Sequence, residues 1–96
     1  DHKEAVKLLR KSAEQGNFYA QYALGREYHL GKGVPKDVVT ALAWWNIASY
    51  NGDEDALSIT GDGKDNIVKE MTPDQIAKAE ALYKEMVKKN PKLLNY

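Results

Sequence analysis

The chain repeats one pattern of small, large apolar and glycine residues with a period of about 36 residues. The recurring pairs are Ala5 and Ala41, Leu8 and Trp44, Leu9 and Trp45, Ser12 and Ala48, Gly16 and Gly52, and Ala20 and Ala56. A weaker third copy pairs Pro35 with Pro73, Ala41 with Ala79, Trp44 with Leu82 and Trp45 with Tyr83. Such a period is typical of a helical solenoid, in which each unit buries its apolar face by stacking on its neighbours.

Apolar residues recur at helical spacing in four long segments of the chain. These segments are residues 2–16, 17–31, 37–52 and 72–90. Gly31 is expected to end the second helix in the left-handed conformation, and Thr72, Pro73 and Gln75 form the start of the last. The shorter segment 65–71 is expected to be helical too. Strand patterns are nearly absent, so we predict an all-α fold.

Each long helix is expected to bury one face. In the first segment this face contains Ala5, Leu8, Leu9, Ser12 and Ala13. In the third segment it contains Ala41, Trp44, Trp45, Ala48 and Ser49. We therefore expect both tryptophans to lie mainly in the core. The third segment is also apolar on its other sides, which is typical of a helix packed between neighbours.

Residues 4–56 carry a set of glycine, alanine and aromatic positions at fixed spacing. The matching positions are Gly16, Ala20, Leu24, Gly25, Tyr28, Gly31, Gly33, Val34, Asp37, Ala41, Trp44, Trp45, Ala48, Gly52 and Ala56. This pattern resembles the Sel-one-like repeat, a relative of the tetratricopeptide repeat. The resemblance implies a right-handed α/α superhelical solenoid of about five antiparallel helices. It also implies that residues 30–37, "LGKGVPKD", are the tight corner between the two helices of one repeat.

Glycine has two expected uses in this repeat. In the corner, Gly31 and Gly33 can adopt backbone angles that other residues resist, and Asp37 can cap the helix that follows. Gly25 lies inside a helix, where glycine costs about 1 kcal/mol relative to alanine. We expect a neighbouring helix to pack closely against the bare backbone at Gly25 and to offset this cost.

The resemblance divides a single domain, residues 1–96, into three units. Residues 3–16 are the second helix of a partial repeat, residues 17–52 are a full repeat, and residues 53–96 are a degenerate C-terminal repeat with a closing helix. In the last unit Thr60, Gly61 and Lys64 replace residues of the repeat pattern, so its first helix is expected to break or to carry an inserted loop. The chain is thus expected to be the C-terminal part of a longer array.

Composition argues against several classes of function. Fourteen basic and fourteen acidic residues give a net charge of zero, which offers no reason to expect nucleic-acid binding. The longest apolar run is far shorter than the roughly 18 residues of a membrane span, so membrane insertion is not expected. There is no cysteine, and His2 and His29 are isolated, so neither a zinc site nor a nucleophilic triad is predicted. We predict no catalytic residue, no metal and no cofactor, and therefore no enzyme. The cellular compartment remains unknown.

The loop from Asp53 to Asn66 contains two motifs that could suggest ligands. "GDGKD", residues 61–65, lacks the first glycine and the final Ser or Thr of a nucleotide-binding P-loop. Counted from Asp53 or from Asp62, the segment also fails the glycine and glutamate positions of an EF-hand. We expect a solvated loop, and the sequence assigns no role to residues 61–66.

A candidate partner-binding surface lies on the second helix. Ala20, Leu24 and Tyr28 share one side of this helix, with Gln21 and Glu27 flanking them. The opposite stripe contains Tyr19, Tyr22, Arg26 and His29. The family resemblance implies that this stripe faces the concave groove, and tyrosine and arginine dominate protein–protein hot spots. The alternative is that the tyrosines cover the core of a neighbouring repeat.

The resemblance implies an adaptor or scaffold that binds a protein or a peptide segment on the concave face. Two other functions stay open: a structural segment that supports a functional domain elsewhere in a longer protein, and a regulator or inhibitor of a partner enzyme. Self-association through exposed ends of the solenoid is also possible. The sequence does not identify the partner.

Overall fold

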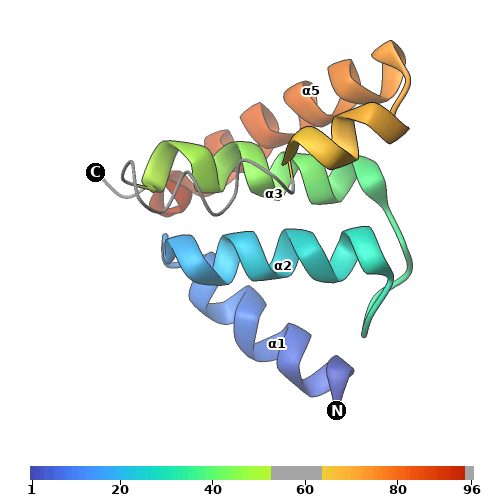
Figure 1. Cartoon of the computed structure of the whole chain (residues 1–96). Coiled ribbons are helices and arrows are strands. Elements are labelled where there is room, and N and C mark those ends of the chain that lie inside the picture. The colour runs from blue at the N-terminus through green and yellow to red at the C-terminus, as the bar shows by residue number, and fades with distance from the viewer. Residues whose placement is uncertain (53–63, 95–96) are drawn as a thin grey trace.

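The computed structural model describes residues 1–52 and 64–94, and all regular structure within these ranges is helical (Figure 1). The elements are α1 (His2–Ala13), α2 (Phe18–Leu30), α3 (Val38–Asn51), α5 (Pro73–Lys89) and the 3₁₀ helix η1 (Pro91–Leu93). Residues 64–70 are helical as well. The predicted all-α fold is confirmed, and so is the short helix expected near residues 65–71.

Part of the predicted polar loop folds differently from expectation. Residues 53–63 lie outside the described residues, and they include most of the two motifs considered for phosphate and calcium. Residue 64, which only the expected loop included, and residues 65–66, which both the expected loop and the expected short helix included, are helical. The reason is the apolar pair just beyond them: Ile67 is fully buried and Val68 packs beside it, which holds this segment as a helix against the core.

The long helices stack side by side in chain order. Figure 1 shows α2 between α1 and α3, with α5 and residues 64–70 on the far side of α3. Side chains cap the starts of α2, α3 and α5. Asn17 accepts a hydrogen bond from the Ala20 backbone at 2.9 Å, and Asp37 accepts one from Thr40 at 3.1 Å. Gly31 ends α2 with a φ of 71°, as predicted.

The predicted capping box at the start of α5 is also present. The Thr72 hydroxyl accepts a hydrogen bond from the Gln75 backbone at 3.1 Å, and the Gln75 side chain accepts one from the Thr72 backbone at 2.9 Å. Two backbone N–H groups that have no partner inside the helix are satisfied in this way.

Helix α3 lies between two apolar clusters, and the paired tryptophans divide between them. Trp44 enters a cluster built from α1, α2, α3 and η1. Trp45 enters a second cluster with α5 and residues 64–71. Both indoles are buried, as expected from their repeat positions. A helix that packs on both sides needs apolar residues nearly all round, which explains the composition of α3.

Helix α3 packs tightly against α2 at Gly25. A Cβ atom placed on Gly25 would lie 2.5 Å from Nε1 of Trp45 and 3.1 Å from the carbonyl oxygen of Ala41. The indole N–H of Trp45 donates a hydrogen bond to the Tyr22 carbonyl oxygen at 2.9 Å. The expected packing against a bare backbone is confirmed, and the helix that supplies it is α3.

A buried polar network fixes η1 against the first two helices. The fully buried Gln21 donates from its side-chain amide to the carbonyl oxygens of Ala13 and Leu93, both at 3.0 Å. Asn51 donates to the Gln21 side-chain oxygen at 2.7 Å and to the Leu93 carbonyl at 2.6 Å. Because each buried polar group finds a partner, the network ties α1, α2, α3 and η1 together without an unpaired donor.

The buried face predicted for α1 is partly wrong. Leu8 is 65% exposed and Ala5 is exposed, whereas Val6 is buried at 4%. Leu9 and Ala13 do pack on the first cluster. Helix α1 contacts α2 through the side that carries Val6 and Ala13, so the edge with Ala5 and Leu8 has no helix against it in the described residues.

Trp45→Ala should destabilise the chain by about 3–5 kcal/mol, because it removes a fully buried indole and leaves a cavity. The free energy of unfolding in urea measures this loss. A near-neutral result would show that the Trp45 face of α3 is not part of the core.

Gly25→Ala provides a second test of the same contact. In the wild-type background it should destabilise, although alanine is the better helix former by about 1 kcal/mol, because its Cβ meets the indole. In the Trp45→Ala background the penalty should fall sharply. A double-mutant cycle measures this coupling, and equal effects in the two backgrounds would contradict it.

Candidate functional site

The outward stripe of α2 holds two exposed side chains and two half-buried ones. Tyr19 is 67% exposed, and its ring lies edge-on to Phe18 at 5.1 Å. Arg26 is exposed and makes no hydrogen bond or ion pair with the other described residues. These two of the four predicted residues therefore present their functional groups to solvent.

Tyr22 and His29 instead lie against Trp45. The Tyr22 ring stacks on the indole at 5.9 Å with planes 26° apart, and the His29 ring meets it edge-on at 5.6 Å. Both geometries are favourable for aromatic pairs. The Tyr22 ring therefore packs against the second apolar cluster. Its ring is at the same time half-exposed on the stripe.

His29 also joins α2 to the helical residues 64–70. Its Nε2 lies 3.0 Å from Oε1 of Glu70, a residue that the sequence analysis did not include. The contact spans 41 positions of the chain, and the repeat pattern carries no signal for it. The hydrogen bond from His29 is the main cause that lowers the pKa of Glu70, and the charges of His29 and Lys36 act in the same direction.

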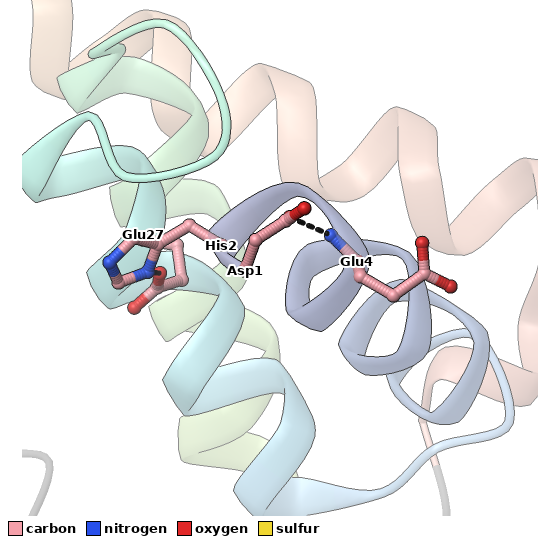
Figure 2. Close-up of polar contacts among 4 residues, drawn as sticks. All are labelled: Asp1, His2, Glu4 and Glu27. Atoms are coloured by element: carbon pink, nitrogen blue, oxygen red, sulfur yellow. Dashed lines mark hydrogen bonds and ion pairs between the residues drawn. The ribbon is translucent and has the colours of Figure 1, made fainter.

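Glu27 does not belong to this surface, although it follows Arg26 directly. Its side chain is buried on the other side of α2, and its Oε2 lies 3.6 Å from Nδ1 of His2. Figure 2 shows these two side chains next to each other, beside the Asp1 carboxylate that caps α1 at Glu4. Because the Glu27 side chain lies away from the stripe, Arg26 has no acidic neighbour on the stripe within α2.

We call Tyr19, Tyr22, Arg26, His29 and Glu70 together the α2 face. It combines the Tyr22 and His29 rings that lie on Trp45, which we call the aromatic floor, a guanidinium without a partner among the described residues, and a carboxylate bonded to histidine. These groups can stack on apolar or aromatic side chains and can donate hydrogen bonds to carboxylate or carbonyl oxygens. Among residues 1–52 and 64–94, no three His, Asp or Glu side chains gather in a way that could hold a metal ion.

A family model described as Sel1 repeat matches residues 1–17 and 18–53, more than half of the chain. The chain belongs to the Sel1 repeat family. Repeats of this family generally serve as scaffolds for protein interaction and are typically not catalytic. The matched residues include α1, the whole of α2 and α3, and so the greater part of the α2 face.

A solved structure supports the same assignment of fold. It is the crystal structure of a protective antigen present in uropathogenic Escherichia coli strains, which displays an SLR fold. The two proteins are 34% identical over 98% of this chain, with a TM-score of 0.83. The chain spans 20% of the length of that protein. The predicted α/α solenoid of Sel1-like repeats is thereby confirmed.

Within the ranges that the structure describes, no helix combines the length and the apolar character that crossing a membrane requires.

Glu70→Gln should remove a contribution to the free energy of unfolding that depends on pH. Because His29 lowers the pKa of Glu70 below its usual value of 4.5, the unfolded chain binds this proton more readily than the folded one. The contribution is therefore present above pH 4.5 and is lost as the pH falls through the lowered pKa. The Tm of the wild type should exceed that of the variant at about pH 6, and the difference should shrink near about pH 3.

A matched control for this test is Glu85→Gln on α5, where the carboxylate lies 3.9 Å from Lys89 and is exposed. It should show a smaller change with pH. A Glu70→Gln difference that stays constant from neutral to acidic pH would mean that the His29 contact does not bias the titration.

Proposed function

We propose that this chain is an adaptor or scaffold module that binds a protein or a peptide segment on its α2 face. The observation that carries the proposal is the pairing of two exposed side chains, Tyr19 and Arg26, with an aromatic floor held in place by Trp45. Membership of the Sel1 repeat family supports an interaction role in general.

The floor is ordered before any partner arrives. Tyr22 and His29 are already packed on the buried indole, and His29 is bonded to Glu70. A partner that covers these rings need not bear the entropic cost of ordering them, which favours affinity. Tyrosine and arginine are also the residue types on which interface energy most often concentrates.

The charges of the α2 face favour an acidic or carbonyl-rich segment with an apolar or aromatic side chain. Arg26 makes no hydrogen bond or ion pair with the other described residues, so its guanidinium can form a bidentate contact, while Glu27 and Glu70 contact His2 and His29. The segment's apolar side chain would cover Tyr22 and the exposed edge of His29. The partner itself is not identified by this chemistry.

The proposal includes the division of the chain into repeats. Residues 3–16 would be the second helix of a partial repeat, residues 17–52 a full repeat that carries the α2 face, and residues 53–96 a degenerate closing unit. Support of a functional domain elsewhere is a second candidate, favoured by the exposed Leu8 edge of α1 and by the 20% coverage of the solved relative. Regulation or inhibition of a partner enzyme is the third candidate.

Charge reversal at Arg26 tests the adaptor proposal. Arg26→Glu combined with Tyr19→Ala should leave the Tm almost unchanged, because both side chains are exposed, yet should abolish capture of the partner. Tyr22→Ala is less suitable because Tyr22 also packs on Trp45. The measurement is affinity capture from a lysate of the source organism, with mass spectrometry of the retained proteins.

Lys11→Glu is the matched control, since it reverses an exposed charge on α1 outside the α2 face. A protein retained by the wild type and by Lys11→Glu, but lost from the double variant, would support an adaptor and place its binding surface. Equal capture by all three folded proteins would rule out the α2 face. Capture of nothing by the folded wild type would favour the structural function.

A further inference from the structure

A cavity of about 370 Å³ opens on a part of the molecule that the α2 face does not reach. It is lined by α3, by the helical residues 64–68 and by α5 from Ile76 to Tyr83. No residue of α2 lines it. Its volume is near the lower end of the range for small-ligand pockets, which suits a group about as large as one amino-acid residue.

The cavity is lined by aliphatic side chains and by a stacked pair of tyrosines. The apolar surface comes from Leu42 on α3, Val68 in the helical residues 64–70, and Ile76 on α5. Tyr50 and Tyr83 stack at 5.9 Å, and their hydroxyl oxygens lie 3.0 Å apart. An aliphatic group could therefore be buried here beside two hydroxyl groups.

Lys64 places a positive charge at the same cavity. Its side chain is half-buried, and its ammonium group makes no hydrogen bond or ion pair with any described residue. Burial is the main cause that lowers the pKa of Lys64, while Tyr50 and Asp65 act in the opposite direction without forming a contact. A cation that is partly removed from water, with no counter-ion among the described residues, favours the arrival of an anion.

Asn46 places an uncharged hydrogen-bond donor, its side-chain amide, at the same cavity as Lys64. It lies on α3 one helical turn from both Leu42 and Tyr50, so that these side chains share the face that lines the cavity. Its amide has no hydrogen-bond partner among the described residues. The acidic lining residue, Glu80, is engaged by Lys84 at 3.1 Å, and both of those side chains are well exposed.

We propose that this cavity binds a carboxylate joined to a short aliphatic group, as found at the C-terminus of a peptide that ends in leucine, isoleucine or valine. The Lys64 ammonium pairs with the carboxylate, and the Asn46 amide donates a hydrogen bond to it. The aliphatic side chain lies against Leu42, Val68 and Ile76. The inference is independent of the proposed function, because the cavity and the α2 face share no residue.

An NMR titration of the 96-residue chain with N-acetyl-leucine tests the proposal, with N-acetyl-leucinamide as the matched probe without the charge. The free acid should cause saturable shifts of the backbone amides of Lys64, Val68 and Ile76, and the amide should bind at least about tenfold more weakly. The absence of saturable shifts, or equal binding of the amide, would overturn the proposal.

A second probe separates the possible sources of the carboxylate. The α-amide of N-acetyl-glutamate offers a side-chain carboxylate without the branched aliphatic group, and it should also bind at least about tenfold more weakly than N-acetyl-leucine. Equal affinity for the two acids would overturn the part of the proposal that assigns a role to the aliphatic walls.

Two variants locate the site. Lys64→Met should lose binding of N-acetyl-leucine by at least about tenfold without a lower Tm, since it replaces an unpaired, half-buried cation with an apolar side chain of similar length. Lys69→Met is the matched control, because Lys69 is exposed and does not line the cavity. Unchanged affinity of Lys64→Met, or an equal loss in Lys69→Met, would overturn the assignment.

Ile76→Trp keeps Lys64 and fills the cavity instead. Ile76 is partly exposed at the cavity wall, so a larger side chain can be accommodated without disturbing the buried clusters. This variant should also lose binding of N-acetyl-leucine, with its fold confirmed by circular dichroism. Retained binding in the folded variant would show that the probe binds elsewhere.

Discussion

The contact of Trp45 with the backbone of Gly25 is the interaction on which the rest of the structure depends. It sets the distance between α2 and α3, and the indole N–H adds a hydrogen bond to the Tyr22 carbonyl. One side of the indole supports Tyr22 and His29 on the α2 face. The ring also belongs to the cluster that holds residues 64–71 and α5 in place. A core residue thus determines the position of a candidate binding surface, because a rigid support fixes the side chains that lie on it.

The two candidate sites lie in different units of the repeat and arise in different ways. The α2 face is formed by the outward stripe of α2, in which the Tyr22 and His29 rings lie on Trp45. The cavity arises one unit later, where α3, residues 64–68 and α5 enclose space that large side chains do not fill. Leu82 and Tyr83 stand where the preceding unit has paired tryptophans, and both are only partly buried. Where the repeat pattern is lost, smaller side chains replace the paired tryptophans, and a partly polar pocket lies beside the tightly packed core.

Polar groups inside the molecule act as ties between units rather than as reactive centres. Gln21 and Asn51 link α1, α2 and α3 to η1 through hydrogen bonds to the carbonyl oxygens of Ala13 and Leu93 and to each other. Glu27 meets His2 near the N-terminus, and His29 meets Glu70 across two units. The sequence analysis placed Gln21 and Glu27 only at the edge of the buried side, because a helical projection locates an angle and not the depth of the neighbouring helix.

The sequence by itself determined the helices, their caps, the burial of both tryptophans and the Sel1 repeat fold, because local spacing, capping residues and a fixed period encode these features. It also placed Tyr19, Tyr22, Arg26 and His29 on one stripe. Only the tertiary structure decided that Tyr22 and His29 cover Trp45, that Glu70 joins them, and that Leu8 is exposed while Val6 is buried. Contacts between units far apart in the chain follow from how helices are placed against each other, and side-chain periodicity within a single helix does not contain that information.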